Sequence, residues 1–319
     1  MASPILTLPP NARLINIGTH SLALYTHGPE PSTPQDPVVL FISGVASDAL
    51  NWQAVLRLLG QTSSSLRSYT YDRSGYNNSQ SSPLAPTAEN IALELSLLID
   101  HAPIANPLIL VGHSWAGVLI HEFIALKGVE QIAGLVLVDA NHETAPLVMD
   151  VNDPVLWTVA KGVEPYAAWG VEANHKLTAQ EWAAFRAAES MEKHKAIANK
   201  EDEEYKGSFE ILRKKELSQL QPLLGDKPVF VIAGTRSRDW SGLYKAGVAK
   251  GNGTEGERRH VRGLIEAVDA KSEGLMREFL QLSTESKIVF ATESGHFVQL
   301  MQPEIVVDGV KWVLNNLAL

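Results

Sequence analysis

Short apolar runs recur along the chain and give the clearest indication of its fold. Five of them are rich in Val, Ile and Leu and lack the polar alternation of a strand with one solvated face. Continuous apolar runs are typical of strands that are buried on both faces of a parallel sheet. The five predicted strands cover residues 37–43, 107–112, 134–139, 228–234 and 287–292.

Helical patterns separate these runs. At residues 89–101 and 304–317, apolar residues recur three and four positions apart, which is the spacing of one helix face. Strands that alternate with helices predict an α/β fold, in which a mostly parallel central sheet has helices on both faces.

The alternation stops over residues 143–224. This stretch has helix-like segments at 179–198 and 202–220 and no convincing strand. We therefore predict a helical cap (lid) that is inserted into a core formed by residues 1–142 and 225–319.

A second irregular stretch lies at residues 250–257, which read KGNGTEGE. Its composition predicts a mobile loop. The glycines lack the spacing and the terminal Lys-Ser/Thr of a phosphate-binding loop, so no nucleotide site is expected there.

Composition and charge exclude several classes of protein. The 319 residues are 45% hydrophobic and 20% charged, which excludes wholesale disorder. The formal charge of −9 has the wrong sign for a protein that binds nucleic acid. The chain has no cysteine, which excludes disulfides, thiolate catalysis and Cys-ligated zinc. Because no run of about 18 apolar residues occurs, we expect a soluble cytoplasmic protein that does not bind membranes.

The segment from Leu108 to Leu119 reads LILVGHSWAGVL and is the most informative for chemistry. A buried strand meets an apolar helix at a tight turn, and Ser114 stands on that turn. A serine there has its hydroxyl exposed at the carboxyl end of the sheet, as a nucleophile requires. The alternative is that Ser114 only caps the following helix.

Serine needs a base to become nucleophilic, and His296 is the best candidate. It follows the last predicted strand within the sequence SGHF, so it is expected at the same edge of the sheet as Ser114. The alternative is that His296 is an ordinary polar group on the surface. His113 precedes the serine, and we expect it to point into the strand packing in a structural role.

Two backbone N–H groups are predicted to stabilise an oxyanion. The first long buried strand is followed by a turn at Gly44, which directs the N–H of Val45 toward the nucleophile, and the N–H of Trp115 supplies a second donor. The alternative is an ordinary strand-to-helix turn.

Four motifs in this order make the chain resemble the α/β-hydrolase superfamily: the turn FISG, the loop YDRSGYNNS at residues 71–79, VGHSWAG, and SGHFVQLMQPE near the end. The resemblance covers residues 38–142 and 227–313, and the helical stretch between them stands where that superfamily has its cap. Two positions depart from the pattern. Ser43 replaces the familiar histidine before the turn glycine, and Asn77 replaces a glycine.

The resemblance leaves two candidates for the acid of a Ser-His-Asp triad. In most relatives the acid stands about three residues after the glycine that closes the post-cap strand. Here that place holds Ser237, and Asp239 comes two positions later. In other relatives, including some haloalkane dehalogenases and the fungal zearalenone lactonases, the acid ends the pre-cap strand, where Asp139 stands. We favour Asp139.

These residues together predict a metal-free serine hydrolase that needs no cofactor and cleaves an ester or lactone of a small apolar molecule. Carbon–carbon bond hydrolases and hydroxynitrile lyases of the same fold stay open, as does a non-hydrolytic small-ligand receptor. A metallohydrolase has little support, because the sequence has no H-E-x-x-H motif. Aromatic residues of the cap either line a ligand site or form the core of the cap itself, and the second is the commoner arrangement: Trp157, Tyr166, Trp169, Trp182 and Phe185.

Overall fold

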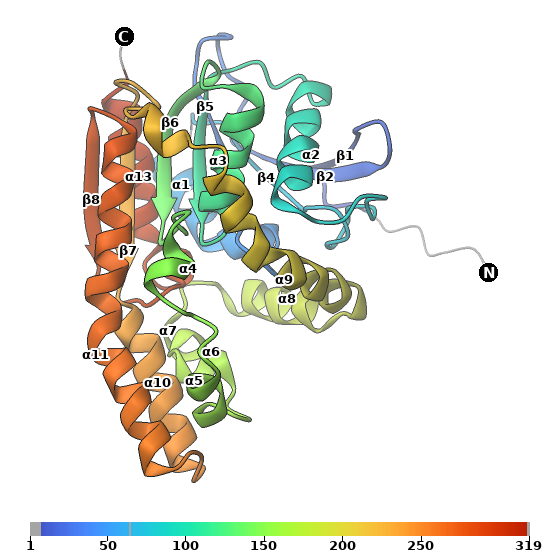
Figure 1. Cartoon of the computed structure of the whole chain (residues 1–319). Coiled ribbons are helices and arrows are strands. Elements are labelled where there is room, and N and C mark those ends of the chain that lie inside the picture. The colour runs from blue at the N-terminus through green and yellow to red at the C-terminus, as the bar shows by residue number, and fades with distance from the viewer. Residues whose placement is uncertain (1–7, 64, 318–319) are drawn as a thin grey trace, which may run out of the picture.

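The computed structural model of the protein describes residues 8–63 and 65–317 and contains an eight-stranded sheet (Figure 1). The strands are β1 (Ala12–Asn16), β2 (Ser21–His27), β3 (Val38–Ile42), β4 (Ser68–Tyr71), β5 (Leu108–His113), β6 (Ile132–Val138), β7 (Val229–Gly234) and β8 (Ser286–Ala291). Their order in the sheet is β1-β2-β4-β3-β5-β6-β7-β8. All neighbouring strands from β4 to β8 run parallel, whereas β1 and β2 pair antiparallel at one edge. The mostly parallel sheet predicted from the sequence is confirmed.

The strands that the apolar pattern did not predict are β1, β2 and β4. β1 reads ARLIN and is mostly exposed, and β4 is only SYTY, without an aliphatic residue. β1 and β4 carry too few aliphatic residues to produce the apolar runs that reveal the central strands, and β2, which reads SLALYTH, has its aliphatic residues only in its first half.

The two faces of the sheet are buried by alternate residues of the same strand. In β3, Val38, Leu40 and Ile42 enter one apolar core, and Val39 and Phe41 enter the other. This follows from the twofold side-chain alternation of a strand and explains why the run contains no polar residue.

Helices on both faces complete the two cores. One face packs against α1 and α13, and the other packs against α2, α3 and α11. The helices predicted at 89–101 and 304–317 are found as α2 and α13 with ends shifted by one or two residues. The bounds are α1 (Gln53–Thr62), α2 (Ala88–His101), α3 (Ala116–Lys127), α11 (Glu255–Glu278), α12 (Val298–Met301) and α13 (Pro303–Asn315).

The predicted cap range contains the helical region between β6 and β7. Its last two helices differ from the prediction, because the break falls at the extended residue Met191 and not at 198–202. Lys200 and Glu201 are good helix formers, so nothing local ends the helix there. The helices are α4 (Ala145–Val148), α5 (Pro154–Val159), α6 (Pro165–Ala168), α7 (Val171–Asn174), α8 (Ala179–Ser190) and α9 (Glu192–Arg213).

A second helical insertion separates β7 from β8 and was not predicted. It consists of α10 (Arg236–Ala249) and the long α11. The loop predicted at 250–257 is too long, since Thr254 and Glu257 form a capping box that starts α11 at Glu255. In such a box each side chain binds the backbone N–H of the other residue, and this fixes a helix start within a glycine-rich stretch.

The two insertions pack against each other. α10 and α11 extend beyond the sheet, and α5 and α6 lie along them (Figure 1). The contact is a close approach of backbones: a Cβ placed on Gly247 of α10 would lie 1.9 Å from the carbonyl oxygen of Val159. Of the helices in the described part of the chain, none combines the length and apolar character that a membrane crossing requires.

This packing predicts opposite effects for one substitution at two helical glycines. Gly247→Ala should lower the free energy of unfolding by about 1–3 kcal/mol, because the added methyl overpacks the contact with Val159. Gly263→Ala in α11 is the control, since a Cβ there meets no atom within 4 Å. It should raise the free energy of unfolding by up to about 1 kcal/mol through helix propensity. Urea denaturation measures both, and stabilisation by both variants would contradict the close approach.

Candidate active site

The carboxyl ends of the parallel strands β5, β6 and β8 bring three predicted side chains together. Ser114 follows β5, Asp139 follows β6, and His296 lies in the loop after β8. Ser114 Oγ is 2.9 Å from His296 Nε2, and His296 Nδ1 is 2.6 Å from Asp139 Oδ2. The three groups therefore form a continuous relay in which the serine hydroxyl donates to the ring and the ring donates to the carboxylate.

Ser114 stands on the turn between β5 and α3 in a left-handed conformation with φ 57°. Such a backbone is unfavourable for a residue with a side chain and persists only where its surroundings enforce it. Here the carbonyl oxygen of Ser114 accepts hydrogen bonds from the N–H groups of Gly117 and Asn141. These bonds hold the turn and direct the hydroxyl toward His296, and the residue itself is only 6% exposed.

The two candidate acids have different positions relative to His296. Asp139 contacts the ring, whereas Asp239 lies in the first turn of α10 and accepts a hydrogen bond of 2.7 Å from the backbone N–H of His296. Asp239 therefore holds the histidine loop through the backbone and forms no hydrogen bond with the imidazole. Burial raises the pKa of Asp239 to about 7.

Asp139 is fully buried and is compensated by charge and hydrogen bonds. Arg236 Nη2 lies 3.0 Å from its Oδ2, and the N–H of Gly234 donates to its Oδ1 over 3.1 Å. Burial works to raise the pKa of Asp139, but Arg236 and the hydrogen bond from His296 outweigh it and hold the pKa well below its usual value. Sequence reasoning missed Arg236, because its position shortly after β7 does not distinguish it from an arginine that caps a helix.

His296 is held by its backbone as well as by its ring. The carbonyl oxygen of His296 accepts a 2.9 Å hydrogen bond from His113 Nε2, and its backbone N–H donates to Asp239. His113 is thus buried under the histidine loop, where its ring also packs against the ring of His296 with 4.5 Å between centroids. Burial, and then the charge of Arg236, lower the pKa of His296, and the bond to Asp139 opposes this shift. The ring is therefore biased toward the neutral form that accepts a proton.

The turn after β3, residues 43–48, lies against the serine. We call these residues the β3 turn. A Cβ placed on Gly44 would be 2.8 Å from the Cβ of Ser114, so only glycine allows this approach. In the described part of the chain, the N–H groups of Val45 and Trp115 donate to no acceptor. Neither of the two predicted donors is therefore occupied by a hydrogen bond to these residues.

The family model of the Alpha/beta hydrolase family matches residues 39–308. This chain belongs to the α/β-hydrolase family. The resemblance drawn from the four motifs is thereby confirmed, with a match that runs through both helical insertions.

Two curated relatives show how far the sequence likeness extends. A protein of Hormonema carpetanum described as a probable transporter, efuK, is 32% identical over 309 residues, which cover 95% of this chain and 42% of the relative. The chain therefore spans less than half the length of that protein. A protein of Gibberella zeae described as an AB hydrolase superfamily protein is 29% identical, with 92% of this chain and 91% of the relative covered.

Solved structures repeat the fold. A thermophilic esterase from Thermogutta terrifontis superposes with a TM-score of 0.58 at 17% identity, covering 96% of this chain and 99% of the esterase. Identity at this level shows the shared fold of the family.

A polar pair that the sequence did not reveal borders Ser114 in this α/β-hydrolase. Asn141 Oδ1 is 3.5 Å from Ser114 Oγ and accepts a 3.0 Å hydrogen bond from the hydroxyl of Tyr205 on α9. Both residues line a cavity of about 140 Å³ that also includes Met149 and Phe209. The cap and the core thus meet beside Ser114.

Most aromatic residues of the cap pack on one another. Tyr166 makes edge contacts with Trp169, Trp182 and Phe185, and Trp169 lies 5.3 Å from Phe297 between ring centroids. Because Phe297 follows His296, this cap core rests on the histidine loop. Trp157 stands apart on α5 and is 42% exposed. Among residues 8–63 and 65–317, no three His, Cys, Asp or Glu side chains are grouped to hold a metal ion.

The ion pair between Arg236 and Asp139 predicts a shift in the titration of His296. Arg236→Met removes a positive charge that disfavours the imidazolium, so the pKa of His296 should rise. NMR titration of the His296 ring measures this directly. Arg238→Met, which removes the same charge from an exposed neighbour on α10, should leave the ring unchanged. A His296 pKa that stays constant or falls in Arg236→Met would contradict the assignment.

Proposed function

We propose that this α/β-hydrolase is a serine hydrolase that cleaves an ester or lactone of a small apolar molecule. The observation that supports this most is the relay from Ser114 through His296 to Asp139, with distances of 2.9 and 2.6 Å. Serine, histidine and aspartate in this sequence of contacts are the arrangement that activates a hydroxyl for acyl transfer.

In the proposed reaction, Ser114 Oγ attacks the carbonyl carbon of the substrate as its proton passes to His296 Nε2. Asp139 holds the proton on Nδ1 and stabilises the imidazolium that forms. The tetrahedral intermediate then collapses, and the leaving alkoxide takes the proton from Nε2. A water molecule repeats the sequence on the acyl-enzyme and releases the acid.

The N–H groups of Val45 and Trp115 are the proposed donors to the oxyanion. Each flanks a residue that packs at the reaction centre, since Val45 follows Gly44 and Trp115 follows Ser114. One such donor is typically worth about 3–4 kcal/mol in the transition state. Donors fixed by the backbone need no rearrangement as charge develops.

The cavity beside Asn141 supports a small substrate. It measures about 140 Å³, and Met149 and Phe209 supply apolar walls. We propose that it takes an acyl or alcohol group of a few carbons, with Tyr205 and Asn141 at its polar end.

The assignment of Ser114 is tested by covalent labelling. A fluorophosphonate should label the wild type once and should not label Ser114→Ala, which should also lose turnover of a p-nitrophenyl ester. Labelling that survives in Ser114→Ala would show that another residue is the nucleophile. A folded wild type that neither turns over esters nor reacts with the probe would favour a small-ligand receptor of the same fold.

The assignment of the acid is tested by a pair of amide substitutions. Asp139→Asn should lower kcat by about 10⁴, because the amide no longer fixes the tautomer of His296. Asp239→Asn should cost little, because its amide oxygen still accepts from the backbone N–H of His296. Kinetics and circular dichroism on both variants check this. The opposite pattern of activity would make Asp239 the acid.

A further inference from the structure

Two side chains of cap helix α9 hold the two peptide units on either side of Ala46 in the β3 turn. Glu201 Oε2 accepts a 2.9 Å hydrogen bond from the N–H of Ala46, and His194 Nε2 lies 3.2 Å from the carbonyl oxygen of the same residue. Glu201 and His194 are two helical turns apart and so lie on one face of α9. The helix therefore binds both polar atoms of the residue that follows Val45.

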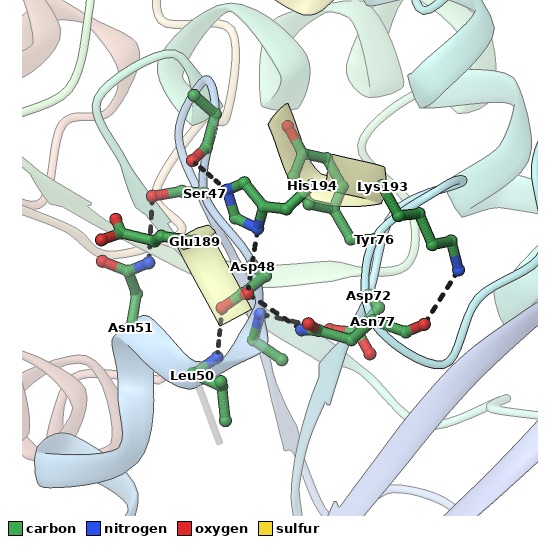
Figure 2. A network of polar contacts seen from close by, with 12 residues as sticks. Ser47, Asp48, Leu50, Asn51, Asp72, Tyr76, Asn77, Glu189, Lys193 and His194 are labelled. Carbon is green, nitrogen blue, oxygen red and sulfur yellow. Dashed lines mark hydrogen bonds and ion pairs between the residues drawn. The ribbon is translucent and has the colours of Figure 1, made fainter. Parts of the chain in front are cut away.

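His194 is enclosed between the turn and the core. Its Nδ1 lies 3.6 Å from Asp48 Oδ2, and its ring packs edge-on against Tyr76 at 4.9 Å (Figure 2). Lys193, the preceding residue, donates to the carbonyl oxygens of Asn77 and Ser79. The start of α9 is thus attached to the loop after β4 as well as to the β3 turn.

Glu201 is part of a buried ion pair that reaches the other end of the turn. Arg73 Nε and Nη2 donate to its two carboxylate oxygens over 2.7 and 2.8 Å. The same guanidinium donates to the carbonyl oxygens of Ser43 and Gly44 over 2.8 and 2.7 Å. Arg73 is 4% exposed and Glu201 is 1% exposed. One carboxylate from the cap and one arginine from the core together bind three backbone groups of the β3 turn.

The β3 turn needs such contacts to keep its conformation. Ala46 has φ 54°, a left-handed backbone that is unfavourable for a residue with a Cβ. The conformation therefore depends on the groups that bind Ala46 from outside. The Val45 N–H, the proposed oxyanion donor, belongs to the Gly44–Val45 peptide, whose carbonyl oxygen accepts from Arg73, and Glu201 binds both Arg73 and the N–H of the next peptide.

We infer that Glu201 and His194 are positioning residues that set the direction of the Val45 N–H, so that the oxyanion site is complete only while α9 is seated on the core. The inference rests on the proposed function and adds a role for the cap beyond shaping a pocket.

The experiment compares paired replacements in which no buried charge is left alone. Arg73→Met/Glu201→Met removes the ion pair, the acceptor for the Ala46 N–H and the Tyr76 hydroxyl, and the donors to the carbonyl oxygens of Ser43 and Gly44. Apolar replacements of a buried ion pair are often neutral for stability. Arg73→Met/Glu201→Gln also removes both charges but keeps an acceptor for the N–H of Ala46. His194→Phe keeps the ring packing on Tyr76 and loses the polar contact. Glu203→Gln, on the exposed side of α9, is the control.

Turnover of a p-nitrophenyl ester is measured for each variant and divided by the number of active sites titrated with a fluorophosphonate. Binding of a trifluoromethyl ketone is measured as well, because the ketone forms a tetrahedral oxyanion with the serine. In Arg73→Met/Glu201→Met we expect kcat per titrated site to fall by roughly 10²-fold with little change in KM. Affinity for the ketone should fall in parallel. Arg73→Met/Glu201→Gln should recover part of the loss, His194→Phe should lose activity, and Glu203→Gln should match the wild type.

The outcomes separate the two proposals. If the double Met variant and His194→Phe keep the wild-type kcat per titrated site, whatever happens to the melting temperature, the positioning role is wrong and the serine hydrolase proposal stands. If the wild type has no turnover and no labelling at Ser114, both proposals are wrong.

Discussion

Parallel pairing from β4 to β8 directs the carboxyl ends of these strands to one edge of the sheet, and the site depends on this constraint. Ser114, Asp139 and the β3 turn each follow directly after a strand that pairs with the next, and His296 follows the last strand. Strand pairing sets the distance between the carboxyl ends of the strands. Short turns after the strands are then enough to bring the side chains into contact. The left-handed backbones of Ser114 and Asp139, with φ of 57° and 42°, are these local turns.

Buried charge is the second organising feature of the site. Asp139 and Glu201 are almost inaccessible carboxylates, and each has an arginine partner, Arg236 and Arg73 respectively. A buried charge costs several kcal/mol unless it is paired and hydrogen bonded. The Arg236–Asp139 pair also binds His296, and the Arg73–Glu201 pair also binds the β3 turn. The contacts that compensate for the burial of charge therefore also hold these groups of the proposed reaction machinery in place. Arg236 has a further effect, because its charge lowers the pKa of His296.

The cap is attached to the core at several distinct places. α5 and α6 rest on α10, the aromatic core rests on Phe297, and α9 binds the β3 turn and the loop after β4. Two of these contacts are made next to residues of the candidate site, since Phe297 follows His296 and Ala46 follows Val45.

The sequence by itself determined five of the strands, the flanking helices α2 and α13, the inserted helical region between β6 and β7, and the positions of Ser114 and His296. These features follow from local signals: apolar runs, helical spacing, and a serine at a strand–helix turn. It left open the choice between Asp139 and Asp239 as the partner of the ring, because both follow strands of the same sheet. The tertiary structure places Asp139 against the imidazole and Asp239 against the backbone of His296. Arg236, Asn141 and the contacts from α9 to Ala46 also appear only in three dimensions. They join residues far apart in the chain through single polar contacts, and such contacts leave no periodicity or motif by which a sequence reveals them.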